Sequence, residues 1–318
     1  MSGTQIEPPI AVIGFSNLGS PIEEAWPSTH RALLPIAGQP VIVRLMQQLS
    51  AQGISHLRIA GSIQQVAVKQ RIGDGSEWGL KVRYSDLHGA DLRSQTLLER
   101  GRCLYLAGDV LHAGRFESSG ALGRMETTKR LSAVEEESSL WALDVNGEQR
   151  LRLSPVRNEA TASLRLADAG SFHRANLAAV KGLINNINIP GRQMRSGVWE
   201  DWSTDVADDA HIGDRVVIGK HCSIGSGVKL HSDVIVGNGC IIMKHAQLKN
   251  VTLLPNTYIG SDVRLRDAIV SPIGIFDFGD HYWPIGNEHL ISRSRSNQEA
   301  ATGIPSEHLN LTEKELRT

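Results

Sequence analysis

Short apolar runs alternate with helical patterns over the first 110 residues of the chain. The run IAVIGF, residues 10–15, is typical of a buried strand, and QPVIVRLMQQLSAQG, residues 39–53, is typical of a helix with one apolar stripe. Further strands are predicted at residues 56–60, 80–84 and 103–109, with helices at 63–72 and 93–101 between them. This alternation predicts a doubly wound α/β fold, in which helices cover both faces of a mostly parallel sheet.

From Val206 onward the pattern changes to a period of six residues. Nine consecutive hexads begin with an aliphatic residue: Val206, Ile212, Ile218, Ile224, Leu230, Val236, Ile242, Leu248 and Leu254. Small or β-branched residues fill the fifth place of the hexads. This hexapeptide repeat predicts a left-handed β-helix, in which three hexads form one triangular coil and residues 18 apart stack.

The 18-residue coil also predicts which side chains share a ladder. One ladder is expected to contain Ile212, Leu230 and Leu248, and a second to contain Ile218, Val236 and Leu254. Cys222 and Cys240 stack on the same spacing. Parallel side chains in one ladder lack the crossed geometry of a disulfide, so both cysteines are expected to be buried, reduced thiols.

The two patterns divide the chain into an α/β domain at residues 1–200, a single-stranded left-handed β-helix at 201–272 and a C-terminal tail at 273–318. A chain of 318 residues has room for two domains that each bury a core. After the α/β strands, the segment SLWALDVNGEQRLRLS predicts a hairpin with a type I′ turn at Asn146-Gly147.

Charge and cysteine content exclude several function classes. The formal net charge is −1, and no basic stripe invites nucleic acid. Three cysteines fit a reducing compartment rather than a disulfide framework. No apolar stretch approaches the ~20 residues that span a bilayer, and the N-terminus lacks the basic region of a signal peptide. The expectation is a cytoplasmic protein that binds neither nucleic acid nor membrane.

Candidate chemistry lies at the carboxyl ends of the predicted strands, where such sheets bind ligands. The loop after the first strand lies there, and so does Asp109 at the end of strand 103–109. An aspartate in this place either caps the next turn or holds Mg²⁺ against phosphate oxygens. Asp168 precedes a predicted helix with Ser171 as its expected N-cap. It is either an acid favoured by the helix dipole or a second metal ligand.

The stretch AVIGFSNLGSPIEEAWPSTHRALLPIAGQPVI, residues 11–42, resembles the N-terminal signature of the sugar-nucleotide pyrophosphorylases, also called sugar-phosphate nucleotidyltransferases. The match is closest at ALLPIAGQP (Ala32–Pro40) and extends through LAGDVL, residues 106–111. In this family a glycine-rich loop wraps the nucleotide phosphates, and two aspartates hold the metal. The resemblance implies a phosphate loop with Gly14, Asn17, Gly19 and Ser20, Mg²⁺ ligands at Asp109 and Asp168, and a phosphate contact at Arg31.

Several residues depart from the family pattern. The loop motif Gly-Thr-Arg is replaced by Gly19-Ser20-Pro21, which removes a cation and a backbone N–H. Arg31 replaces a lysine, keeping the charge but changing its geometry. Only 59 positions (168 − 109) separate Asp109 from Asp168, which leaves a short region for enclosing a sugar.

Three functions therefore follow from the sequence. The resemblance implies transfer of a nucleoside monophosphate from a nucleoside triphosphate to a sugar 1-phosphate, in nucleotide-sugar or surface-polysaccharide metabolism, by a homo-oligomer assembled through the β-helix. The change at Pro21 favours an alternative, a catalytically impaired paralogue that binds a nucleotide sugar or a partner enzyme as a regulator or scaffold. The β-helix alone permits a third, a hexapeptide-repeat acyltransferase with one of these histidines as base: His211, His221, His231 and His245.

Overall fold

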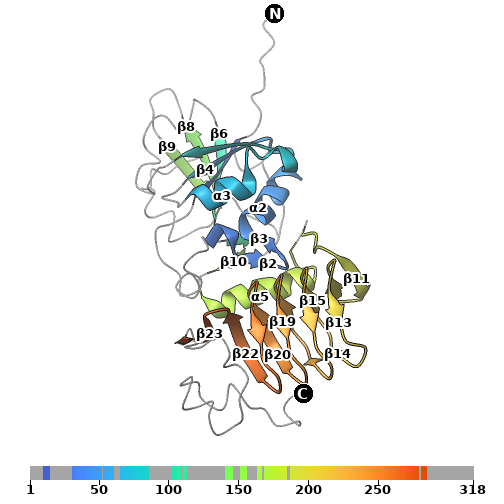
Figure 1. Cartoon of the computed structure of the whole chain (residues 1–318). Coiled ribbons are helices and arrows are strands. Elements are labelled where there is room, and N and C mark those ends of the chain that lie inside the picture. The colour runs from blue at the N-terminus through green and yellow to red at the C-terminus, as the bar shows by residue number, and fades with distance from the viewer. Residues whose placement is uncertain are drawn as a thin grey trace, which may run out of the picture.

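The computed structural model (Figure 1) describes residues 10–14, 31–51, 53–60, 65–85, 102–108, 110–112, 140–145, 151–155, 163–166, 168–184, 187–278 and 281–284. The predicted helix at 93–101 lies outside these residues. An α/β domain occupies the N-terminal part, and a β-solenoid of about 4 turns runs over residues 198–270. The predicted fold class, an α/β domain followed by a β-helix, is confirmed.

The N-terminal sheet has six strands in the order β5-β4-β1-β6-β8-β9. Their bounds are β1 (Ile10–Gly14), β4 (His56–Ala60), β5 (Lys81–Ser85), β6 (Arg102–Ala107), β8 (Leu140–Val145) and β9 (Leu151–Pro155). The first four strands in this order are parallel, while β8 and β9 are antiparallel. The predicted parallel sheet is therefore present and is extended by a hairpin.

The hairpin has a longer connection than the sequence predicted. Its register pairs Val145 with Leu151, so five residues, 146–150, join the two strands. A type I′ turn centred on Asn146-Gly147 would leave only two. The predicted hairpin is confirmed and a two-residue connection is wrong, while the conformation of the connecting residues lies outside the described part of the chain.

The described helices between β1 and β5 are α2 (Val41–Ser50), α3 (Gln65–Ile72) and the short 3₁₀ helices η1 (Arg31–Leu33) and η2 (Ser76–Trp78). The predicted apolar stripe of α2 is confirmed, because Ile42, Leu45, Met46 and Leu49 are fully buried. They belong to the same core as the sheet residues. The pattern at helical spacing was therefore sufficient to place this helix.

The hairpin of β2 (Pro35–Ile36) and β3 (Gln39–Pro40) lies between η1 and α2. Ala37 and Gly38 form its turn with φ of 45° and 82°, the left-handed values of a type I′ turn. The guanidinium of Arg44 is buried beneath this turn. It donates to Ile36 O and Ala37 O and, at 2.5 Å, to Asn188 O. Burial lowers the pKa of Arg44 to about 10. The arginine thus ties the hairpin to the chain that leads into the β-helix.

The β-helix is built from short parallel strands, each stacked on its equivalent one coil earlier. They are β12 (Val198–Glu200), β13 (Asp205–Val206), β14 (His211–Ile212), β15 (Val216–Ile218), β16 (Ser223–Ile224), β17 (Lys229–Leu230), β18 (Val234–Val236), β19 (Ile241–Ile242), β20 (Gln247–Leu253), β21 (Tyr258–Ile259) and β22 (Arg264–Ser271). Stacking already begins at Val198, which pairs with Val216.

The strands form three faces, named here by one element each. The α5 face, named after helix α5 (Ala169–Val180), consists of β12, β15, β18 and the second halves of β20 and β22; the β16 face consists of β13, β16, β19 and β21. The β17 face consists of β14, β17 and the first halves of β20 and β22. From Ile218 to Leu248 every hexad lead is buried inside the coils, as the repeat predicted.

One predicted ladder is confirmed and the other is corrected at its last member. Leu230 pairs with Ile212 and Leu248. Val236 stacks on Ile218 but pairs onward with Leu253, not Leu254. One residue is missing from the corner at Asn250, so that coil is 17 residues long and Leu254 faces outward into the domain interface. The break in period therefore lies before Leu254.

Helix α5 (Ala169–Val180) lies along the α5 face, as Figure 1 shows. Its buried residues Phe172, Ala175 and Ala179 share a core with the outward residues of that face: Val217, Ile235, Leu254 and Ile269. The same core contains the sheet and α2. One continuous apolar core therefore joins the α/β domain to the β-helix.

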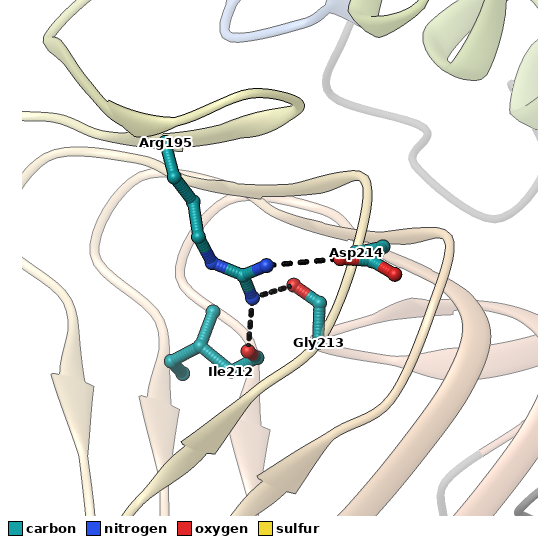
Figure 2. A network of polar contacts seen from close by, with 4 residues as sticks. All are labelled: Arg195, Ile212, Gly213 and Asp214. Carbon is teal, nitrogen blue, oxygen red and sulfur yellow. Dashed lines mark hydrogen bonds and ion pairs between the residues drawn. The ribbon is translucent and has the colours of Figure 1, made fainter.

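Antiparallel strands cover both ends of the α5 face. The strands β11 (Arg192–Arg195) and β12 form a hairpin at the first coil, and β23 (Gly274–Asp277) and β24 (Tyr282–Pro284) extend the sheet at the last. Arg195 also reaches the β17 face: it pairs with Asp214 at 2.9 Å and donates to Ile212 O and Gly213 O (Figure 2). The carbonyl groups of the first coil have no preceding coil whose N–H groups could donate to them. Arg195 donates to two of these carbonyls instead.

Cys222 and Cys240 are buried and free of disulfides, as predicted. Their Sγ atoms contact Gly237 O and Leu254 O, respectively. Contact with Cys222 and burial raise the pKa of the Cys240 thiol. Both residues therefore act as small interior packing groups. Among the described residues, no helix is long and apolar enough to cross a membrane.

Candidate functional site

The candidate site begins where β1 and β6 end side by side. Gly14 is the last residue of β1 and pairs with Ala60 and Ala107 on either side. Beyond this pair, Gly108 N donates to Gly14 O at 2.6 Å. The remaining predicted loop residues, Asn17, Gly19, Ser20 and Pro21, lie outside the described part of the chain. Their phosphate-binding role stays a prediction.

Arg31 begins η1, immediately before the buried residues Ala32 and Leu34. Leu34 O accepts a hydrogen bond from Val41 N at 2.9 Å, which fixes the end of this segment to the start of α2. The backbone at Arg31 is thus anchored by its neighbours, while the position of its side chain lies outside what the structure describes. Its predicted phosphate contact stays a prediction.

Asp168 is the N-cap of α5, and Ser171 is not. The Asp168 carboxylate accepts from Ser171 N at 2.6 Å, and Asp168 N donates to Ser171 Oγ at 3.0 Å, which completes a capping box. The predicted cap at Ser171 is therefore wrong by three residues. Capping engages the oxygen Oδ1 of Asp168. The second carboxylate oxygen, Oδ2, takes part in neither hydrogen bond of the capping box.

The topology brings the segments of the two predicted metal ligands together. The strands β7 (Val110–His112) and β10 (Ser163–Arg165) pair antiparallel, with Val110 opposite Arg165. Asp109 precedes Val110 directly in sequence and itself lies outside the described residues. Asp168 follows Arg165 by three positions. The chain therefore enters this ladder after Asp109 and leaves it toward Asp168 at the same end.

The described residues alone do not form a metal centre. They contain no group of three or more His, Cys, Asp or Glu side chains placed to hold a metal ion. Asp168 offers the hard carboxylate oxygen that Mg²⁺ prefers. A metal site at this edge would thus combine Asp168 with ligands from outside the described part of the chain.

The polar contact between α5 and the β-helix was not predicted from the sequence. His173 Nδ1 lies 2.7 Å from Thr252 Oγ1, and His173 Nε2 lies 2.6 Å from Asn250 Oδ1. Burial lowers the pKa of His173, although its hydrogen bond to Asn250 works against this shift. A histidine among the mostly small and apolar residues of this helix was the available signal.

The histidines considered for acyl transfer are spread over the β-helix. His221 and His245 lie at corners with φ of 56° and 60°, and both are exposed. His211 and His231 lie on the β17 face with ring centroids 6.4 Å apart. Burial lowers the pKa of His231. No loop interrupts the described coils between Val198 and Val270 to build an acceptor pocket beside any of these histidines.

Comparisons with known proteins agree with both parts of the chain. The family model described as bacterial transferase hexapeptide (six repeats) matches residues 209–244, within the β-helix. A glucose-1-phosphate thymidylyltransferase from Streptomyces griseus is 24% identical over 282 residues, which cover 77% of this chain and 77% of that protein. The second similarity therefore spans the α/β domain and the β-helix together.

Two further matches are shorter. A mannose-1-phosphate guanylyltransferase from Mycobacterium tuberculosis is 30% identical over 74 residues, which are 23% of this chain and 21% of that protein. A solved Bacillus anthracis structure assigned as a glucose-1-phosphate thymidylyltransferase is 21% identical, with a TM-score of 0.28, over 34% of this chain and 46% of that one. This last overlap is too small to bear on the fold.

Proposed function

Since the chain is a homologue of the sugar-phosphate nucleotidyltransferases with a hexapeptide-repeat β-helix, we propose that it moves a nucleoside monophosphate from a nucleoside triphosphate to a sugar 1-phosphate. In this reaction an oxygen of the sugar phosphate attacks the α-phosphorus, the bond to the β-phosphate breaks, and pyrophosphate leaves. The similarity over 77% of the chain carries the proposal, because it includes both domains in the same order.

The proposed roles follow the edge of the sheet. Gly14, Asn17, Gly19 and Ser20 present backbone N–H groups to the triphosphate, and Arg31 pairs with phosphate oxygens. Asp109 and Asp168 hold a divalent metal, proposed to be Mg²⁺, which would neutralise charge on the phosphates. Asp168 suits this role because its carboxylate is fixed by capping through Oδ1 while Oδ2 remains outside that bond.

The replacement at Pro21 supports a second candidate, a nucleotide-sugar-binding regulator without turnover. One preorganised charge-stabilising donor typically contributes ~10²–10³ to the rate of such a step. Proline supplies neither a cation nor an N–H. The histidines on the β-helix support acyl transfer less well, because three of the four are exposed and no loop of the described coils builds a pocket beside them.

The test is pyrophosphate release from each common nucleoside triphosphate with several sugar 1-phosphates and Mg²⁺, together with nucleotide affinity by calorimetry. Turnover that needs both substrates would support the proposed enzyme. Nucleotide binding without turnover would support the regulator. The absence of both nucleotide binding and turnover would contradict the enzyme and the regulator alike.

A matched pair of variants isolates the metal role of Asp168. Asparagine caps helices about as well as aspartate, so Asp168→Asn is expected to keep α5 and lose metal-dependent nucleotide binding. Asp168→Ala removes the cap as well and should lower the free energy of unfolding by ~1 kcal/mol. If Asp168→Asn binds metal and nucleotide like the unsubstituted chain, the metal role is wrong.

Pro21→Arg is expected to raise nucleotide affinity if the loop keeps the family conformation.

A further inference from the structure

Helix α5 runs along the axis of the β-helix rather than across its coils. Its first turn lies near the last coil, where a Cβ on Gly170 would be 3.5 Å from Phe278 Cβ, and its C-cap Lys181 lies near Asp233 two coils earlier. Helical rise is 1.5 Å per residue and neighbouring strands are ~4.8 Å apart. One helical turn therefore advances by about one coil, which lets successive turns contact successive coils.

His173 is the polar contact in this arrangement. It is 2% exposed, and its two ring nitrogens are both within hydrogen-bond distance of β20. Because Asn250 Oδ1 only accepts, Nε2 carries a proton, and the neutral ring then accepts from the Thr252 hydroxyl through Nδ1. The two hydrogen bonds fix the ring on both sides, one to Asn250 at a corner and one to Thr252 on the α5 face.

The partners of His173 are themselves fixed by the shortened corner. Asn250 has φ of 56°, and Asn250 Nδ2 donates to Asp267 Oδ1 at 2.5 Å in the next coil. In the earlier coils the equivalent corner carries the ion pair of Arg215 and Asp233 and has one residue more. The corner is therefore shorter at the coil that α5 contacts through His173.

The ring of His173 also contacts Phe278, which lies beside the first turn of α5. The rings of His173 and Phe278 stack with centroids 4.8 Å apart. Phe278 Cβ lies 3.5 Å from the place that a Cβ on Gly170 would take, and Asp168 Oδ1 is equally close to that place. A contact path thus leads from Thr252 on the β-helix to the capping carboxylate of Asp168.

From this geometry we propose that His173 is a positioning residue: it registers α5 on the β-helix and so sets the place of Asp168 at the edge of the sheet. The importance for catalysis rests on the proposed function, in which Asp168 is a metal ligand. The coupling itself depends only on the contacts of His173. The β-helix is then part of the site's support and not only an assembly module.

Amide exchange at Ser171 and Phe172 tests the coupling in the full chain. These two N–H groups bond to the Asp168 carboxylate at 2.6 Å and to the Asp168 carbonyl at 3.0 Å, so their protection reports the cap directly. Thr252→Val removes the hydroxyl with little change of shape. It is expected to speed exchange of both amides roughly fivefold to tenfold, as the loss of one buried hydrogen bond implies.

Ile242→Val is the matched control, because Ile242 is buried inside the coils of the β16 face and lies away from α5. Its expected loss of global stability is similar, ~1 kcal/mol. A purely structural role predicts equal exchange changes in both variants, and that result would overturn the proposal. The proposal would also be overturned if amide exchange at Ser171 and Phe172 stayed unchanged in both Thr252→Val and His173→Gln.

Mn²⁺ titration links the coupling to the proposed function without needing turnover. The affinity for Mn²⁺ in the presence of nucleotide is expected to fall severalfold in Thr252→Val and to stay unchanged in Ile242→Val. Equal affinities in all three chains would overturn the link between His173 and the metal site. If the unsubstituted chain binds no Mn²⁺, the metal role of Asp168 fails, and the exchange experiment alone decides the role of His173.

Discussion

The α5 face and the β16 face of the β-helix have the same interior but different surroundings. On both, aliphatic residues such as Val236 and Ile242 point into the coils. Outward, the α5 face carries Ile235 and Ile269, which are at most 4% exposed beneath the helix. The β16 face carries Ile241 and Tyr258 in equivalent outward positions, 43% and 39% exposed.

The difference shows that one repeat can serve two purposes. The inward positions make the coil, and the outward positions decide what the coil contacts. On the α5 face those outward residues belong to the core of the α/β domain, so the domain and the solenoid stabilise each other. On the β16 face the described residues of the chain leave similar side chains exposed. Two predictions test this contrast, and two more test how the coils are held on the third face, the β17 face.

The largest effect is expected from placing a charge on each face. Ile269→Asp puts an unpaired carboxylate into the shared core and should lower the free energy of unfolding by ~4 kcal/mol or more. Ile241→Asp faces solvent and should cost ~1 kcal/mol or less. Urea denaturation of both variants measures the difference. Similar losses would mean that the α5 face is not buried in solution.

The next effect concerns backbone contact between coils on the β17 face. A Cβ on Gly213 would lie 1.5 Å from His231 O, closer than any atoms can pack. Gly213→Ala should therefore displace the first coil and cost ~1–3 kcal/mol. His231→Ala occupies the equivalent position one coil later, already has a Cβ, and serves as the control. A Gly213→Ala chain with unchanged melting temperature would show that the first coil adapts freely.

A smaller effect is expected from pH at the α5 face. Burial lowers the pKa of His173, while Asn250, Asp233 and Asp267 oppose the shift and Arg174 adds to it. The unfolded chain therefore takes up a proton near pH 6.5 that the folded chain refuses until lower pH. Folding stability is then lost as pH falls below ~6.5, by at most ~1.4 kcal/mol per pH unit.

Comparison with His173→Gln isolates this contribution. The unsubstituted chain should lose more stability than the variant between pH 7.5 and 5.5, in urea denaturation at constant ionic strength. His221→Gln, at an exposed corner, is the control for the loss of one histidine. Parallel pH curves for all three chains would show that His173 does not titrate differently in the folded state.

The smallest effect is expected at the end of the β17 face. Arg195 is 50% exposed and Asp214 72% exposed, so their ion pair is weakened by water (Figure 2). Arg195→Ala also removes the donors to two first-coil carbonyls and should cost ~0.5–1 kcal/mol. Asp214→Asn, which leaves those donors, should cost less. Equal melting temperatures for both variants would mean that the carbonyl contacts contribute nothing.

The sequence was sufficient where periodicity decides structure. Alternation placed β1, β4, β6 and α2, and the hexads placed the interior of the coils, because burial of one face imposes the pattern directly. The family resemblance is closest at ALLPIAGQP, but only the structure showed the turn at Ala37 and Gly38 and the buried Arg44 beneath it. The predicted phosphate-loop residues after Gly14 and the ligand Asp109 remain sequence predictions, since they lie outside the described residues.

What the sequence by itself determined is the solenoid, its inward side chains and the strands of a mostly parallel sheet, with Gly14 at the carboxyl end of the first strand. What only the tertiary structure decided is how the parts meet. The missing corner residue at Asn250 moves Leu254 out of its ladder, and helix capping selects Asp168 over Ser171. A period in one segment carries no information about a partner far along the chain, so the contact of His173 with Thr252, 79 residues away, appears only once both are folded.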